Sequence, residues 1–323
     1  MLAIQVDQPG GPEVLKVADL PVPVCGPDQL LVELAFSGVN FIDIYQRQGI
    51  YPMPSPYVPG LEGSGVVIEV GSSVKGFSAG DKVAWPSSLG SYSQVHAVNA
   101  ASVVRVPDGV SLDVACAAML QGMTAHYLMA SLYEVKPGDT ALVHAAAGGV
   151  GQLLCQMISN RGATVVGTAS TSEKAEIARQ AGASHVIRYD TEDVASKAKE
   201  LTDGIGVDVV YDGVGLATFD GSLASLKRRG MMALFGGASG MVPPFDLQAL
   251  SRMGSLFVTR PTLADYIVGP GEMQWRADEI FAEHLAGKLN FAIGNTYALK
   301  DASTAHTDLA ARKTTGKLLL VTK

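Results

Sequence analysis

The chain has 323 residues, 47% of them hydrophobic and 17% charged, and a formal net charge of −7. This length is typical of two domains of roughly 100–200 residues each, and the hydrophobic content argues against disorder. The acidic balance argues against a nucleic-acid-binding protein, which needs a basic face, and three scattered cysteines, Cys25, Cys116 and Cys155, predict neither a disulfide framework nor a thiolate metal cluster.

Short β-rich segments follow one another in the first part of the chain. Glycines and prolines separate four such runs, at residues 30–34, 65–70, 81–85 and 102–106. Short runs between turn residues are typical of β-strands. We therefore expect a compact antiparallel β unit up to about residue 120.

From about Pro137 the pattern changes to apolar β runs that alternate with helical stretches. Strands are expected at 140–144, 164–168, 185–187, 207–212, 231–235 and 255–259, and helices at 149–160, 173–181, 192–201 and 218–226. This alternation predicts parallel βαβ units in a doubly wound sheet. After Pro261, a helix at 277–286 and a strand at 317–321 break the alternation, and we expect this tail to return to the first domain.

A glycine-rich turn, AAAGGVG at residues 145–151, follows the first strand of this alternating part. It is a variant of G-x-G-x-x-G, with Ala146 where the first glycine would stand, which implies a turn without positive φ there. Because it follows a strand and opens a helix within a βαβ unit, its context favours a dinucleotide site over a turn without a ligand. Gly148 would let the backbone approach a pyrophosphate at the helix N-terminus, and Gly151 would allow close packing of helix on strand.

The end of the next strand carries small hydroxyls where NAD-specific sites place an acidic residue. Residues 167–174 read GTASTSEK. Ser170 can donate to a phosphate and Lys174 can supply the positive charge that a 2′-phosphate needs. The sequence therefore predicts NADPH as cofactor. The alternative is that residues 170–172 only cap the helix, while Glu173 and Lys174 form a solvated face.

The order of these parts resembles the medium-chain dehydrogenase/reductase superfamily, and in particular its zinc-free NADPH:quinone oxidoreductase branch. The resemblance is carried by segments throughout the chain: 38–43 (GVNFID), 59–65 (PGLEGSG), 80–83 (GDKV), 120–125 (LQGMTA), 144–151 (HAAAGGVG) and 211–215 (YDGVG). It implies an α/β fold, with a GroES-like β-rich catalytic domain at 1–124 and 263–323. A Rossmann NADPH-binding domain with a doubly wound parallel sheet would occupy 125–262.

Zinc-dependent relatives have a Cys where this chain has Asn40 and a His where it has Leu61. Catalytic zinc takes three N, S or O ligands, and these replacements leave Glu62 alone. No cysteine falls between Cys25 and Cys116, so the lobe that holds a structural zinc in those relatives is also missing. We expect no metal site, and therefore an acceptor that is easily reduced without a Lewis acid. Quinones meet that condition.

The resemblance also implies the site residues. Asn40 and Tyr45 would be the catalytic pair, as neutral donors toward a carbonyl oxygen that gains charge. Cofactor contacts are expected from Asn40, Phe41, Ile42, Asp43, Tyr45, Thr124, Tyr127, Gly148, Gly149, Val150, Ser170, Lys174, Tyr189, Phe235, Gly236, Gly237, Ala238, Pro261, Thr262, Leu263 and Arg312. Two of these have a structural alternative, since Phe235 could pack in the core and Arg312 could pair with an acidic neighbour. Gly213 departs from relatives that have Ser at that position.

The expected activity is NADPH-dependent transfer of a hydride or a single electron to a quinone or another small conjugated carbonyl. Two alternatives stay open: reduction of activated C=C bonds in alkenals or enoyl thioesters, and a non-catalytic, crystallin-like or RNA-binding role, against which the acidic balance weighs. We expect neither an export signal nor a run long enough to cross a membrane, and therefore a cytoplasmic protein. The resemblance implies a homodimer paired at the edge strand near residues 255–258.

Overall fold

The computed structural model describes residues 1–322, and the chain divides into two compact units. The first unit comprises Met1–Met123, Met273–Leu285 and the chain from Phe291 onward; the second comprises Thr124–Glu272 and Ala286–Asn290. The expected domain boundaries after residues 124 and 262 stay predictions. Among the described residues, no helix is both long and apolar enough to cross a membrane.

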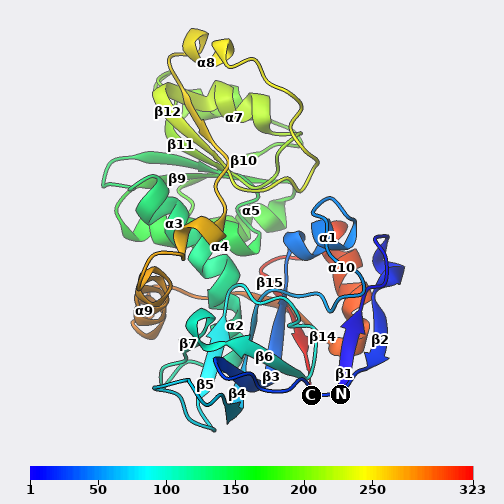
Figure 1. The fold of residues 1–323 in the computed structure, drawn as a ribbon. Helices are drawn as coiled ribbons and strands as arrows, with labels where there is room; N and C mark the ends of the chain where they lie inside the picture. The colour runs from blue at the N-terminus through cyan, green and yellow to red at the C-terminus, as the bar shows by residue number, and fades with distance from the viewer. Residues whose placement is uncertain (323) are drawn as a thin grey trace. The chain divides into compact units, whose positions relative to one another are not determined.

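A six-stranded, all-parallel sheet forms the centre of the second unit, drawn in green to yellow in Figure 1. Its order is β10 (His185–Arg188), β9 (Thr164–Ala169), β8 (Thr140–Val143), β11 (Val207–Asp212), β12 (Leu226–Leu234) and β13 (Phe257–Thr259). This is the doubly wound arrangement that the alternating pattern predicted, and its strand order reverses between β8 and β11. Ligands of such sheets bind at the carboxyl ends of the strands near that point.

The helices of the second unit pack in pairs, α4 (Gly149–Asn160) beside α5 (Ser172–Gln180) and α6 (Val194–Glu200) beside α7 (Phe219–Ser225). A short α8 (Gln248–Arg252) follows β12. Apolar residues of the strands and of α7 form one core, which includes Leu142, Val166, Val210, Met232 and Leu223.

The strand expected at 231–235 begins earlier, at Leu226. This part of β12 contains Lys227, Arg228 and Arg229, and Arg229 has φ +59°. The pairing with β11 shifts between Val207 and Val209. Because charged residues and an irregular backbone interrupt the apolar pattern, the first half of the strand was not predicted.

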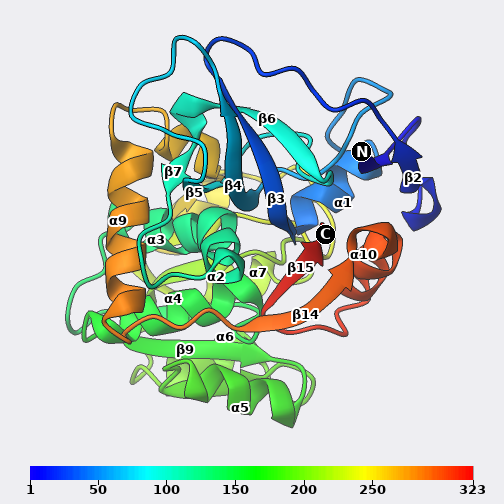
Figure 2. The ribbon, with the colours of Figure 1, turned by 90° about the horizontal axis from the view of Figure 1, so that it is seen from below.

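The first unit contains a seven-stranded, mostly antiparallel sheet (Figure 2). Its path is β14 (Ile293–Ala298), β15 (Lys317–Val321), β3 (Gln29–Val39), β4 (Gly63–Val70), β5 (Lys82–Trp85) and β7 (Val104–Arg105), with β6 (Val95–Asn99) also on β3. Only β14 and β15 pair in parallel. β15 lies beside β3, with Leu318 opposite Val39, so the last strand joins a sheet begun near residue 29. β1 (Leu2–Gln5) and β2 (Lys16–Asp19) form a separate hairpin.

Four α-helices begin in or belong to this unit: α1 (Phe41–Arg47), α2 (Leu112–Ala117), α9 (Glu272–Leu285) and α10 (Ala302–Ala310). α2 continues through a π-helical turn at Ala118–Gly122 into α3 (Met123–Tyr127) and a second π-helical turn at Leu128–Leu132. Short 3₁₀ turns occur at Pro12–Val14, Ala100–Ser102, Leu263–Tyr266 and Leu299–Asp301. The turn at Ala100–Ser102 includes the first residue of the strand expected at 102–106. The observed strand, β7, is limited to Val104–Arg105.

Candidate functional site

The glycine turn of the second unit links β8 to α4. Its N–H groups bond to the neighbouring strand and to the turn itself, from Ala146 to the Thr168 carbonyl (3.0 Å) and from Gly148 to the Ala145 carbonyl (2.8 Å). Ala145 has φ +50°, whereas Ala146 is not among the residues with positive φ. The expectation for Ala146 is therefore confirmed, and the strained position lies one residue earlier.

Gly151 lies where no side chain fits. A Cβ built on it would lie 2.3 Å from the Ala145 carbonyl oxygen and 2.8 Å from Ala146 Cα. Both atoms belong to the backbone, so only movement of the turn or of α4 could relieve the clash. The close approach of helix and strand predicted for this glycine is confirmed.

A buried chain of hydrogen-bonded polar side chains connects the glycine turn to the neighbouring strands. His144 Nδ1 lies 3.2 Å from Thr168 Oγ1, and His144 Nε2 lies 2.9 Å from Ser222 Oγ. Ser222 donates to Asp212 Oδ2 at 2.7 Å, and Asp212 also accepts the N–H groups of residues 214 and 215. The chain therefore ties together the carboxyl ends of β8, β9 and β11.

The direction of each hydrogen bond in this chain follows from Asp212, whose carboxylate can only accept. Ser222 donates to it and must accept from His144 Nε2, so His144 Nδ1 accepts from the Thr168 hydroxyl. The Thr168 oxygen in turn accepts the Ala145 N–H at 3.3 Å. Burial lowers the pKa of His144 and the nearby Asp212 charge raises it, which fits a neutral ring.

At the end of β9, the structure shows which hydroxyl caps α5. Thr171, rather than Ser170, is the N-cap of α5 and accepts from the Lys174 N–H at 3.2 Å. A second cation lies beside this turn, because Arg188 donates to Ser172 Oγ at 2.6 Å and forms two bonds to Asp190, of 2.8 and 2.5 Å. Arg188 ends the neighbouring strand β10 and is not among the predicted cofactor residues.

Two further loops meet at this edge of the sheet. Gly236 lies against the Gly213 carbonyl, where a Cβ would come within 2.4 Å of the oxygen, and the Ser239 N–H donates to the Val214 carbonyl at 2.8 Å. A Cβ on Gly213 would meet the half-buried ring of Phe235 at 2.9 Å. The Ser of some relatives would therefore require this ring to move.

The other expected cofactor residues of the second unit follow strands or lie on the helix that leads into the unit. Tyr127 is buried and stacks on Tyr266 at 4.4 Å between ring centroids, and Thr124 is also buried. Residues that follow β10, β12 or β13 share the carboxyl edge with the glycine turn: Tyr189, Phe235, Gly236, Gly237, Ala238, Pro261, Thr262 and Leu263. Their contacts with a dinucleotide stay predictions.

In the first unit, Asn40 precedes α1 and belongs to a buried ionic cluster. Asn40 Nδ2 donates to Glu62 Oε1 at 2.6 Å, and Asn40 Oδ1 accepts from Lys317 Nζ at 2.9 Å and from Gln121 Nε2 at 3.3 Å. Lys317 also forms an ion pair with Glu62, whose other oxygen accepts the Leu120 N–H at 2.8 Å. Asn40, Glu62 and Lys317 are at most 5% exposed. Burial lowers the pKa of Lys317 to about 7, and the Asp43 charge raises it.

A second buried cluster holds the rest of α1. Asp43 Oδ2 accepts the Asn40 N–H at 2.8 Å and the Tyr92 hydroxyl at 3.1 Å. Because Tyr92 donates to Asp43, it accepts from His306 Nε2 at 3.0 Å, and His306 Nδ1 faces Arg47 at 3.4 Å. Burial raises the pKa of Asp43 to about 6 and lowers that of His306 to about 3.

Three aromatic rings group on the more exposed side of α1. Phe41 and Tyr45 are 6.3 Å apart between centroids, and Tyr45 packs edge-on against Tyr51 at 5.6 Å. Ile42 is half-buried in the same helix. Arg312 is exposed and follows α10, which packs against α1 and ends at Ala310; its φ is +56°.

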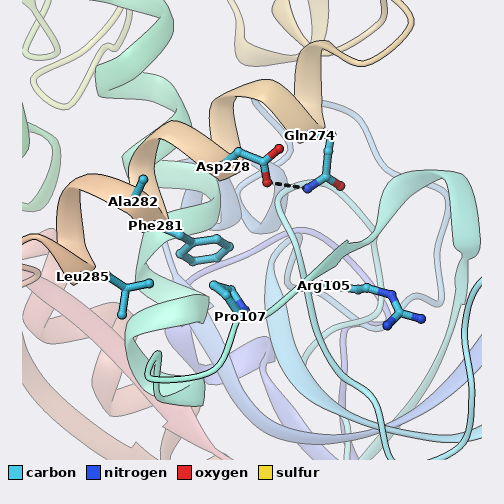
Figure 3. Close-up of a pocket in the computed structure, with 7 residues that line it drawn as sticks. All are labelled: Arg105, Pro107, Gln274, Asp278, Phe281, Ala282 and Leu285. Atoms are coloured by element: carbon cyan, nitrogen blue, oxygen red, sulfur yellow. Dashed lines mark hydrogen bonds between the residues drawn. The ribbon is translucent and has the colours of Figure 1, made fainter.

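A cavity of about 310 Å³ in the first unit is lined by Arg105, Pro107 and one face of α9. In Figure 3, Phe281 and Leu285 point toward Pro107, and Gln274 bonds to Asp278. No predicted site residue lines this cavity. Within residues 1–322, no group of three His, Cys, Asp or Glu side chains is arranged to hold a metal; the expectation of a metal-free site stays a prediction.

The fold and these residues define the class of the protein. Its residues 26–130 match the family described as alcohol dehydrogenase GroES-like domain, and residues 149–282 match the family described as zinc-binding dehydrogenase. The chain is 45% identical over 320 residues to a quinone oxidoreductase of Pseudomonas aeruginosa, with 98% of each chain covered. A 2-haloacrylate reductase of Burkholderia is 40% identical, with 99% of each chain covered.

Among solved structures, Escherichia coli quinone oxidoreductase complexed with NADPH is similar to this chain with a TM-score of 0.97 and 41% identity. The match covers 99% of this chain and 100% of the other. The chain belongs to the quinone oxidoreductase branch of the medium-chain dehydrogenase/reductase superfamily. The predicted fold class and family are confirmed.

Proposed function

We propose that this protein catalyses the NADPH-dependent reduction of quinones. The observation that carries the proposal is the glycine turn, which has the geometry of a dinucleotide site in a chain similar over its whole length to a structure of an NADPH-complexed quinone oxidoreductase. NADPH, when bound, supplies a hydride to the acceptor. The small-molecule acceptor would be a quinone or a related conjugated carbonyl.

The residues present fit a dinucleotide. α4 is 12 residues long and begins directly at the turn, and the first N–H groups of a helix have no partner within it. Together with the partial positive charge of the helix end they suit a pyrophosphate. Because Gly151 has no Cβ, the turn lies close to the helix. The pyrophosphate would therefore contact Gly148, Gly149 and Val150.

Selectivity for NADPH is assigned to the turn between β9 and α5. Ser170 and Lys174 would bind the 2′-phosphate, with Tyr189 beside the adenosine. Because Thr171 already caps α5, the Ser170 hydroxyl is not needed for that role. Arg188 places a guanidinium next to Ser172, although this guanidinium is already paired with Asp190.

Asn40 and Tyr45 are proposed as the catalytic donors. The Asn40 amide gives one N–H to Glu62 and retains a second N–H, which would donate to the quinone oxygen as that atom gains charge. Tyr45 would donate its phenol to the same oxygen or leave protonation to water. Phe41 and Tyr51 hold the Tyr45 ring by aromatic contacts.

The test is turnover of 1,4-benzoquinone and 9,10-phenanthrenequinone with NADPH. Removing a donor to a developing oxyanion typically costs about 10²–10³ in kcat, so Asn40→Ala is expected to lower kcat/KM by about that factor. Tyr45→Phe should cause a smaller loss. If neither variant nor their combination changes kcat/KM, the assignment is wrong.

Reduction of activated C=C bonds is the second candidate, since the similar Burkholderia protein is a 2-haloacrylate reductase. Parallel assays of quinones, 2-alkenals and 2-haloacrylates would decide between the two. Preference for an alkene acceptor by more than tenfold in kcat/KM would replace the quinone proposal.

We also propose a cytoplasmic homodimer. β13 is the edge strand of its sheet, and Phe257 is 57% exposed on it. An exposed edge with a large apolar side chain is a ready surface for pairing with another strand. A second copy of the chain would cover this edge.

A further inference from the structure

The Asn40 amide lies between two charged groups, one of which can only donate hydrogen bonds and the other only accept them. Lys317 Nζ donates to Asn40 Oδ1, and Glu62 Oε1 accepts from Asn40 Nδ2. An ammonium has no acceptor and a carboxylate has no donor, and the Glu62 carboxylate at Lys317 Nζ favours the charged form of the lysine. A rotated amide would turn its NH₂ toward the ammonium and its oxygen toward the carboxylate, so both contacts would become repulsive.

The two charged groups are themselves fixed. Glu62 accepts the Leu120 N–H through its second oxygen and pairs with Lys317 through the first. Gly38 leaves the room for this pair, because a Cβ there would come within 2.1 Å of Glu62 Oε1 and 2.6 Å of Lys317 Nζ. Neither charge has access to solvent that could weaken its preference.

We propose that Lys317 and Glu62 are positioning residues that fix the orientation of the Asn40 amide, so that nitrogen and not oxygen faces the reacting carbonyl. This inference rests on the proposed function, in which Asn40 is the donor. The pair itself does not touch the acceptor. Its effect on the reaction passes through Asn40 alone.

The deciding variant is the double replacement Glu62→Gln with Lys317→Met. It removes both charges together, which avoids leaving one of them buried and unpaired, and the glutamine introduced at position 62 could bond to the Asn40 amide in either orientation. We expect kcat for 1,4-benzoquinone to fall at least fivefold. The Kd for NADPH, measured by fluorescence, should stay within twofold, because the glycine turn is in the other unit and the variant keeps the Asn40 side chain itself.

A matched control removes an ion pair elsewhere. Asp208→Asn with Lys227→Met breaks the Asp208–Lys227 pair and should leave kcat within twofold of wild type. The second measurement introduces Glu62→Gln with Lys317→Met into Asn40→Ala. We expect no more than a twofold further loss of kcat there, since there is no amide left to orient.

Equal losses of kcat in the wild-type and Asn40→Ala backgrounds would overturn the inference, because the pair would then act by another route. A slow Asn40→Ala enzyme with an unimpaired double variant would overturn the positioning role and leave the donor role intact. An Asn40→Ala enzyme as fast as wild type would refute the donor itself and the inference with it. If the double variant does not fold, Glu62→Gln with Lys317→Gln carries the test, since it also removes both charges and leaves amides that can bond to Asn40 in either orientation, and an unchanged kcat overturns the inference.

Discussion

Replacing Gly151 by alanine perturbs the glycine turn at its tightest point. The new Cβ would lie 2.3 Å from the Ala145 carbonyl oxygen, so the turn or α4 must move by about 1 Å to restore ordinary contact. Overpacking of this kind costs about 1–3 kcal/mol. If the free turn can relax and only the bound state requires the native geometry, the whole cost falls on binding, which is about 5- to 150-fold in Kd.

The assay is fluorescence titration with NADPH, together with thermal unfolding to detect any cost that falls on the fold instead. Gly221→Ala is the matched control, because Gly221 lies within α7 and no heavy atom lies within 4 Å of its added Cβ. That variant should bind NADPH normally and unfold at the same temperature or slightly higher, since alanine favours helix over glycine by about 1 kcal/mol. A Gly151→Ala protein with unchanged Kd and unchanged Tm would refute the packing argument.

Three further predictions concern other parts of the molecule. Lys174→Met should raise the Kd for NADPH about tenfold or more, the worth of a hydrogen bond to a charged group, and leave that for NADH unchanged; equal changes would contradict the phosphate role. Burial lowers the pKa of His306 to about 3, whereas the unfolded ring is protonated below about pH 6.5; the contribution of His306 to the free energy of unfolding should therefore fall by about 1.4 kcal/mol for each unit that the pH is lowered from 6.5 to 3. Urea titrations should show this slope reduced in His306→Gln and retained in His185→Gln, whose histidine is exposed. If the protein forms the proposed dimer, Phe257→Lys should convert it to a monomer in sedimentation, and an unchanged dimer would exclude β13 as the interface.

The sequence could predict the second unit well because its signals are local. Apolar strands alternate with helices there, and α4 and β11 were predicted with the bounds that the structure has. β6 and β14 of the first unit were missed, since each is half exposed and lacks a continuous apolar run. Their strand character comes from pairing with β3 and β15, which sequence periodicity does not report.

The ionic cluster around Asn40 was missed for a related reason. Lys317 reads as an ordinary charged residue before the apolar run of β15. Its burial depends on β15 pairing with β3, which brings it to Glu62 over a sequence separation of 255 residues. Glu62 itself was considered only as a leftover zinc ligand. Glu62 lies in a glycine-rich segment just before β4, so no local apolar pattern marks it as buried.

Both units use a buried charge to set the direction of the hydrogen bonds around it. In the second unit, Asp212 can only accept, and this sets the direction of every bond through Ser222, His144 and Thr168 to the Ala145 N–H. In the first unit, Glu62 and Lys317 fix the orientation of the Asn40 amide. A buried charge is costly to maintain, but it removes the freedom of hydroxyls, amides and imidazoles to reverse. The buried charges therefore fix the orientation of the neutral groups that support the glycine turn and of the Asn40 amide.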